Sequence, residues 1–221
     1  MAVVGVIPAA GFATRLQPLA GSKEMLDVGG RPVVDYVVER MRAASAGEIR
    51  VVTRSDKTDF TEHARELGLT TIEAEPPTLA DSILAGLEDL AQDDVVLLGF
   101  PDSIWEPPSG YAALCEALTA GVDAALGVFR SAEPERGDVV EVDGDRVVAV
   151  HVKPADPPGD LIWGAAVAAA GAFRRLNGHS DPGELFDELA RNGGVQAVRF
   201  PGEFLDIGTK EAVAHARELL G

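Results

Sequence analysis

The sequence predicts an α/β fold with a single domain, residues 1–221, in which helices flank a mixed, mostly parallel sheet. Two observations carry this prediction. Short apolar runs alternate with helix-spaced apolar patterns through the first hundred residues, which is typical of right-handed strand–helix–strand units. Beyond about residue 131 the pattern changes to strand-like alternation, which favours antiparallel strands. We therefore expect a Rossmann-like sheet with a β-rich insertion over about residues 131–170.

The first half of the chain alternates predicted strands with predicted helices. Residues 3–7 are apolar and end at Pro8, as expected of a buried strand in a parallel sheet. From Val34 to Met41 the apolar residues fall at helical spacing. The same patterns predict further strands at residues 48–53, 70–75 and 94–100, and further helices at residues 58–67 and 79–90.

The second half opens with a hairpin signal. "DVVEVDGDRVVAVHV" contains two alternating strands that turn at Asp143 and Gly144. "LIWGAAVAAAG" is a further apolar run, which either a buried strand or a subunit contact explains, so a homo-oligomer remains open. A helix at residues 184–191, a strand at residues 195–200 and a helix from Thr209 complete the predicted order.

The composition is that of an ordinary globular protein, and its net negative charge disfavours binding to polyanions. Hydrophobic residues make up 46% of the chain and charged residues 25%. The net charge of −17 argues against a nucleic acid or an anionic membrane surface as partner. The single cysteine, Cys115, excludes an internal disulfide and fits a reducing compartment. No segment reaches the ~20 apolar residues of a membrane helix, and "MAVVGVIPAAG" does not read as a signal peptide, so we expect a cytoplasmic protein.

A loop of small residues follows the first predicted strand. Ala9, Ala10 and Gly11 would let backbone N–H groups approach a phosphate closely. Arg15 and Lys23 follow, in a chain that has only four lysines. A guanidinium grips phosphate oxygens through its planar fork, and an ammonium adds a compact charge. A tight turn with two solvated cations explains the loop equally well, so the loop alone leaves phosphate binding open.

Two aspartates are candidate metal ligands. Asp102 follows a predicted buried strand and Asp206 precedes the last predicted helix. Mg²⁺ prefers one or two carboxylates together with substrate phosphates, and ligands of open α/β sheets lie beyond the carboxyl ends of the strands. Each aspartate also has a structural explanation, since Asp102 adjoins Pro101 in a turn and Asp206 precedes the helix cap Thr209.

Taken together, these motifs resemble a known family. "AAGFATRLQPL…SKEMLDVGGRP" resembles the signature loop of the sugar-1-phosphate nucleotidylyltransferases, which include glucose-1-phosphate thymidylyltransferases and uridylyltransferases. The resemblance continues in order through "TLADSI", "LLGFPDSIW", "GDVVEVDGDRVVAVHVKP" and "FLDIGTKEAV". It implies a GT-A-like nucleotidyltransferase fold with a small β-hairpin insertion at the sugar site. It also implies transfer of a nucleotidyl group from a nucleoside triphosphate to a small phosphorylated acceptor, with release of pyrophosphate.

The resemblance also implies roles for particular residues. Arg15 and Lys23 would be catalytic, steadying the triphosphate and the developing pyrophosphate. Asp102 and Asp206 would hold Mg²⁺, and Thr78 would border the base. Besides these, the implied nucleotide-binding residues are Ala9, Ala10 and Gly11, and the implied acceptor-binding residues are Gly137, Lys153 and Gly164.

Several positions depart from the usual family form. Ala13 replaces a glycine, a mild change if its φ is negative. Glu24 replaces a proline and sets a carboxylate beside Lys23. Val152 replaces the glutamate before Lys153, and Ala166 replaces an aromatic residue. The nucleotide half of the site is therefore better supported than the sugar half. The acceptor is either an unusual sugar phosphate or another small phosphate such as phosphocholine, and the base is not determined.

Two other functions remain open. A GT-A-type glycosyltransferase shares the nucleotide-binding sheet but normally carries Asp-x-Asp, where this chain has Asp102, Ser103 and Ile104. A catalytically silent relative that binds a nucleotide sugar and regulates a partner is the other alternative. The retained cations and carboxylates speak against silence, and measured pyrophosphate release would exclude it.

Overall fold

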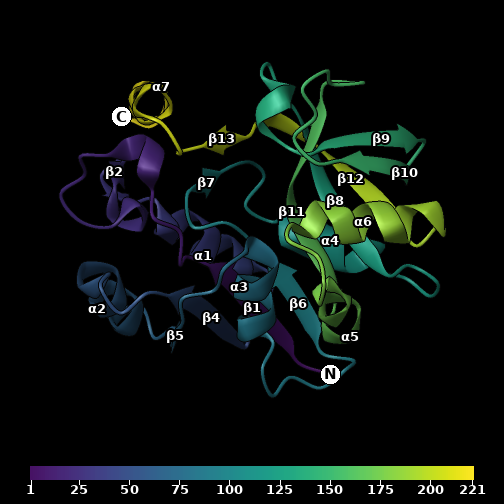
Figure 1. Cartoon of the computed structure of the whole chain (residues 1–221), viewed down its shortest axis with the longest axis horizontal. Coiled ribbons are helices and arrows are strands. Elements are labelled where there is room, and N and C mark those ends of the chain that lie inside the picture. The colour runs from purple at the N-terminus through teal and green to yellow at the C-terminus, as the bar shows by residue number, and fades with distance from the viewer.

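The computed structural model describes residues 1–221 and contains one large sheet of nine strands (Figure 1). The strand order across this sheet is β5-β4-β1-β6-β11-β8-β12-β10-β9. Its strands are β1 (Val3–Pro8), β4 (Glu48–Thr53), β5 (Thr70–Glu73), β6 (Val95–Leu98), β8 (Ala124–Arg130), β9 (Val139–Asp143), β10 (Arg146–His151), β11 (Leu161–Ala169) and β12 (Val195–Glu203). Two small ribbons join β2 (Asp27–Val28) to β3 (Arg31–Pro32) and β7 (Ser103–Ile104) to β13 (Leu205–Asp206). The helices are α1 (Val34–Ala43), α2 (Thr58–Glu66), α3 (Leu79–Gly86), α4 (Gly110–Ala117), α5 (Ala170–Phe173), α6 (Pro182–Arg191) and α7 (Lys210–Leu220).

The sheet is mixed, as the sequence predicted. Strands β5, β4, β1 and β6 are parallel to one another, and β12 is parallel to β8. The remaining pairs are antiparallel, because β11 enters between β6 and β8 in the opposite direction. The predicted hairpin is confirmed as β9–β10, in which Asp143 pairs with Arg146 and Gly144 has a φ of 62°.

Hydrophobic cores lie on both faces of the sheet. Helices α1, α2 and α4 cover one face, and α3, α5 and α6 cover the other. Neighbouring strand residues alternate between the two cores: Val6 faces α3, whereas Ile7 packs in the cluster that contains α1. Burial on both faces explains why the central strands read as continuous apolar runs. No helix in the structure combines the length and apolarity that crossing a membrane requires.

The C-terminal segment returns to the N-terminal half of the molecule. Figure 1 shows β13 running across from the β8–β12 region, and α7 lying beside β2. Strand β13 pairs with β7 so that Asp206 stands opposite Ser103, and Ile207 N–H donates to the carbonyl of Asp102 at 2.8 Å. The β7–β13 ribbon therefore brings Asp206 beside Asp102, although 104 positions separate them in the sequence.

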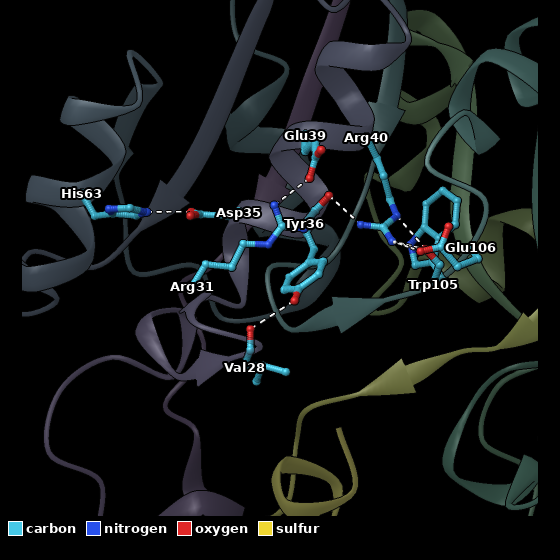
Figure 2. A network of polar contacts seen from close by, with 9 residues as sticks. All are labelled: Val28, Arg31, Asp35, Tyr36, Glu39, Arg40, His63, Trp105 and Glu106. Carbon is cyan, nitrogen blue, oxygen red and sulfur yellow. Dashed lines mark hydrogen bonds and ion pairs between the residues drawn. The ribbon is translucent and has the colours of Figure 1, made fainter. Parts of the chain in front are cut away.

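A buried arginine anchors the segment that carries β7 (Figure 2). Arg40 is 2% exposed. Its Nε donates to the carbonyl of Trp105 at 2.7 Å, and its Nη1 donates to the carbonyl of Tyr36 at 2.8 Å. Tyr36 in turn donates its hydroxyl hydrogen to the carbonyl of Val28 at 3.1 Å. These bonds tie the backbone that follows β7 to α1, and α1 to β2.

Candidate active site

A cavity of about 740 Å³ lies beyond the carboxyl ends of β1 and β6. It extends from the loop after β1 to the start of α6, and residues of β13 and α7 close one side. Most of the residues that the sequence singled out meet here. The predicted site residues on its wall are Ala10, Gly11, Arg15, Lys23, Thr78, Asp102, Gly137, Lys153 and Asp206.

The small-residue loop presents its backbone to this cavity. Gly11 lies on open wall, with no heavy atom within 4 Å of the point where a Cβ would stand. Ala9 is 1% exposed and does not line the cavity. Its contact with a nucleotide therefore stays a prediction. Ala13 has a φ of 52°. The change from glycine was expected to be mild only if φ were negative, and this condition is not met. A left-handed alanine is strained, and it turns the chain into the short 3₁₀ helix that carries Arg15.

The two predicted cations each face a carboxylate. Lys23 Nζ donates to Asp102 Oδ2 at 2.6 Å, and Arg15 Nη2 lies 3.9 Å from Asp206 Oδ2. Burial acts to lower the pKa of Lys23, but the charge and hydrogen bond of Asp102 outweigh it, and the pKa is raised. Lys23 is therefore a charged ammonium near neutral pH, and it lies on the wall of the cavity.

The carboxylates Asp102 and Asp206 fit a divalent cation. Burial and the neighbouring charge of Asp102 raise the pKa of Asp206. Two like charges held together in this way are stabilised when a cation is placed between them. No third histidine, cysteine or acidic side chain joins them to form a complete set of protein ligands. That donor set suits Mg²⁺, which keeps waters and substrate phosphates among its ligands.

At the opposite wall, Thr78 caps helix α3. Its Oγ1 accepts a hydrogen bond from Asp81 N–H at 3.1 Å and donates to Asp81 Oδ2 at 2.6 Å. The hydroxyl is thus engaged in the cap, and contact with a base stays a prediction. One turn further, Ser82 also lines the cavity, and its buried Oγ has no hydrogen-bond partner in the protein. Sequence reasoning missed Ser82, although a serine on the apolar face of a predicted helix is a signal.

The far end of the cavity holds an acidic pair that sequence reasoning also missed. Asp138 is 6% exposed, and its Oδ2 accepts a hydrogen bond from Trp163 Nε1 at 3.0 Å. Its Oδ1 accepts from the backbone N–H of Lys153 at 3.3 Å. Lys153 Nζ reaches the second carboxylate, Asp181 Oδ2, at 2.9 Å. The available signal was an aspartate at the start of an otherwise apolar hairpin strand.

The pKa of Asp138 is raised to about 7 by burial and by the charge of Asp181, with Lys153 and Trp163 acting in the opposite direction. A carboxyl group with a raised pKa binds its proton more tightly in the folded than in the unfolded protein. Its contribution to stability is therefore full at low pH and is lost as the pH rises towards 7.

The Asp138→Asn variant should therefore gain stability relative to the unmodified protein as the pH rises. Asparagine mimics the protonated carboxyl group, so it does not acquire a charge beside Asp181. We expect the difference in unfolding free energy to grow by roughly 1 kcal/mol per pH unit between about pH 5 and pH 7. Urea unfolding at a series of pH values measures this difference. Asp143→Asn, at the hairpin turn, is the control that should show no such trend.

The two predicted acceptor glycines differ in position. Gly137 lines the cavity, and a Cβ there would lie 3.1 Å from Ile162 Cγ2. Gly164 does not reach the cavity: a Cβ there would lie 2.1 Å from Cε2 of Phe204. The ring of Phe204 thus occupies the space over Gly164, and Phe204 itself lines the wall. Gly164 is needed for packing of this ring, and the structure does not place it against an acceptor.

The carboxylate beside Lys23 does not face the cavity. Glu24 is fully buried, and its Oε1 accepts from Lys57 Nζ at 2.7 Å. The same ammonium donates to the carbonyl of Ala9 at 2.6 Å. On the other side of Lys23, Ser22 N–H donates to Asp59 Oδ2 at 2.8 Å. The start of α2 therefore holds both neighbours of Lys23, which leaves Lys23 directed at Asp102.

A small-residue loop, cations and a carboxylate pair therefore lie together at the carboxyl edge of this α/β sheet. The sequence pattern of one family, the MobA-like NTP transferase domain, matches residues 5–192. The chain belongs to this family. The class of enzyme that the resemblance implied is thereby confirmed.

Individual relatives agree with this class. A glucose-1-phosphate thymidylyltransferase of Streptomyces griseus is 29% identical over 168 residues, which cover 71% of this chain and 46% of that protein. A bifunctional sugar-1-phosphate nucleotidylyltransferase/acetyltransferase of Sulfurisphaera tokodaii is 24% identical over 91% of this chain and 51% of its own length. The solved UDP-glucose pyrophosphorylase of Acinetobacter baumannii superposes with a TM-score of 0.83 at 20% identity, covering 100% of this chain and 94% of that one. This last similarity shows the fold.

The curated relatives are longer than this chain. It spans 60%, 33% and 51% of the length of three of them.

Proposed function

We propose that the protein transfers a nucleotidyl group from a nucleoside triphosphate to a sugar 1-phosphate, giving an NDP-sugar and pyrophosphate. The observation that carries this proposal is the meeting of Arg15, Lys23, Asp102, Asp206 and Lys153 around one cavity. Its volume of about 740 Å³ suits a ligand that is larger than a nucleotide alone. The names of the relatives support the same reaction.

The cations would act on the triphosphate. Lys23, held between its two braced neighbours, would neutralise charge on the phosphate that is attacked. Arg15 would meet the leaving pyrophosphate: its side chain is 62% exposed, and at 3.9 Å from Asp206 it forms only a loose ion pair. Charge that develops on the leaving group is then met by groups that are already in place.

At the other end, Lys153 would meet the phosphate of the acceptor. A phosphate oxygen is already ionised near neutral pH, so the attacking group needs no general base. The chain's task is therefore to hold the two substrates in line and to neutralise their mutual repulsion. Asp102 and Asp206 would hold Mg²⁺, which supplies further neutralisation at the attacked phosphate when bound.

The reaction is tested by measuring pyrophosphate release. Each common nucleoside triphosphate is supplied with Mg²⁺ and a panel of sugar 1-phosphates, with phosphocholine and glycerol phosphate included. Release with one pair identifies base and acceptor together. Release with phosphocholine alone would mean that the acceptor is a phospho-alcohol and not a sugar 1-phosphate. Absence of release from every pair would contradict the proposal and favour a silent nucleotide-sugar-binding protein.

Arg15→Ala should lower kcat much more than it changes the KM of the acceptor. The charge of Arg15 pairs with a group that becomes more negative in the transition state, so its loss is felt mainly in turnover. We expect roughly a 10- to 100-fold fall in kcat. Steady-state kinetics with the active pair measures both constants, with the exposed Arg65→Ala on α2 as control. A raised acceptor KM at unchanged kcat would contradict this role.

A further inference from the structure

The acceptor end of the cavity contains one carboxylate that is built into the wall. Asp138 is 6% exposed, yet it lines the cavity. Each of its oxygens accepts one hydrogen bond from the protein, from Trp163 Nε1 and from Lys153 N–H. A carboxylate has about four lone-pair positions, so both oxygens can accept further hydrogen bonds. A side chain that is held rigidly and can accept further hydrogen bonds is suited to select between ligands.

The charges around Asp138 belong to the same cluster. Lys153 from the end of β10 and Asp181 from the start of α6 face it, and they bond each other at 2.9 Å. Other charged groups on the packed elements are engaged elsewhere: Glu141 with His151, and Asp187 with Arg191. Lys153 is the cation that faces Asp138, but its ammonium bonds Asp181 and not Asp138.

The side chains of Asp138 and Val152 both pack against Gly183. A Cβ placed on Gly183 would lie 2.5 Å from Asp138 Oδ2 and 2.9 Å from Val152 Cγ2. Val152 and Asp138 therefore meet at the first turn of α6. Val152 has no polar side-chain atom and does not line the cavity, whereas Asp138 does, so Asp138 is the one of the two that can offer a side-chain acceptor to a ligand.

The aromatic residues nearby do not form a box for a quaternary ammonium. The ring of Trp163 contacts Phe186 with centroids 5.0 Å apart and Phe100 with centroids 5.5 Å apart. It is 6% exposed, so little of its face is open to a ligand. A quaternary ammonium also has no hydrogen to donate to Asp138.

We propose that Asp138 selects the acceptor by accepting a hydrogen bond from one of its hydroxyl groups, so that a hydroxylated phosphate is used and phosphocholine is not. The inference rests on the proposed function for its reaction, but it concerns the acceptor end alone. The bond is buried, and it is charge-assisted when Asp138 is ionised, which is the kind that contributes most to discrimination between ligands.

The test combines one substitution with deoxy acceptors. Asp138→Asn should raise the KM of the acceptor roughly 10-fold or more, and leave the KM of the triphosphate unchanged. The deoxy sugar 1-phosphate that lacks the recognised hydroxyl should suffer a similar loss with the unmodified protein. That deoxy compound should show no additional loss with Asp138→Asn, because the two changes remove the same bond. Asp143→Asn makes the same chemical change on the same strand and should behave like the unmodified protein.

The outcomes separate this inference from the proposed function. An acceptor KM unchanged in Asp138→Asn, with turnover intact, would overturn the role of Asp138 and leave the reaction standing. The role would also be overturned if every deoxy compound raised the acceptor KM by the same factor in Asp138→Asn as in the unmodified protein. If no pair is turned over, binding of glucose 1-phosphate and of phosphocholine is measured by calorimetry. Binding of the sugar phosphate that Asp138→Asn abolishes would then support the inference, whereas equal binding, or none, would overturn it.

Discussion

Replacing Asp206 with asparagine is expected to reduce Mg²⁺-dependent turnover by at least roughly 100-fold while the protein stays folded. Turnover and stability should respond differently because burial and, after it, the charge of Asp102 raise the pKa of Asp206, so its ionised form is disfavoured in the folded protein. Asparagine carries no charge, so the variant should be as stable as the unmodified protein or more so. The same change removes one of the two carboxylates available to a metal. Pyrophosphate release over a range of Mg²⁺ concentrations, together with thermal unfolding, measures both effects.

The matched control for Asp206→Asn is Asp93→Asn. Asp93 is exposed and precedes β6 at the opposite end of the strand from the cavity, so its loss should change neither quantity. Chelation of Mg²⁺ should abolish turnover in the unmodified protein and in the control alike. Near-normal turnover in Asp206→Asn would show that this carboxylate does not hold the metal.

Lys57→Met is expected to destabilise the protein by about 3 to 5 kcal/mol, the usual effect of removing one partner from a buried ion pair. Lys57 is 9% exposed, and it bonds both the fully buried Glu24 and the carbonyl of Ala9. Burial already raises the pKa of Glu24, against the opposing effect of Lys57. Without the ammonium, the carboxyl group must take up a proton or remain as an uncompensated buried charge. Urea unfolding at neutral pH measures the loss.

A second substitution tests the cause of that loss. Lys57→Met combined with Glu24→Leu removes both charges, so it should recover a large part of the stability lost in the single variant. Lys210→Met, which removes an exposed ammonium from the start of α7, is the control. A single variant less than about 1 kcal/mol below the unmodified protein would contradict the buried-pair argument.

The regular elements could be predicted because each has a local cause. Strand β1 follows from an apolar run that ends at Pro8, and α1 follows from the helical spacing of Val34 to Met41. The hairpin β9–β10 follows from Asp143 and Gly144 at its turn. The place of β11 between β6 and β8 has no such local cause, since an apolar run does not state its neighbours or its direction.

The candidate site divides in the same way. Lys23 and Asp102 were found because their motifs are local, but their pairing at 2.6 Å was not predicted. The bond between Lys57 and Glu24 joins residues 33 positions apart, and the sequence around either residue does not predict the other as its partner. Asp138 was overlooked because its place in the site depends on a hydrogen bond from Trp163, which reaches it from β11. Long-range pairing of this kind is decided by the fold as a whole.

The β7–β13 ribbon has a consequence for the order in which the protein becomes competent. Asp102 is synthesised near the middle of the chain, whereas Asp206 and the helix behind it belong to the last twenty residues. A nascent chain can therefore build the sheet and the small-residue loop before the second carboxylate has left the ribosome. Emergence of β13 from the ribosome is then the event that brings the second carboxylate beside Asp102. An interrupted or clipped chain would keep much of the sheet and lack that pair.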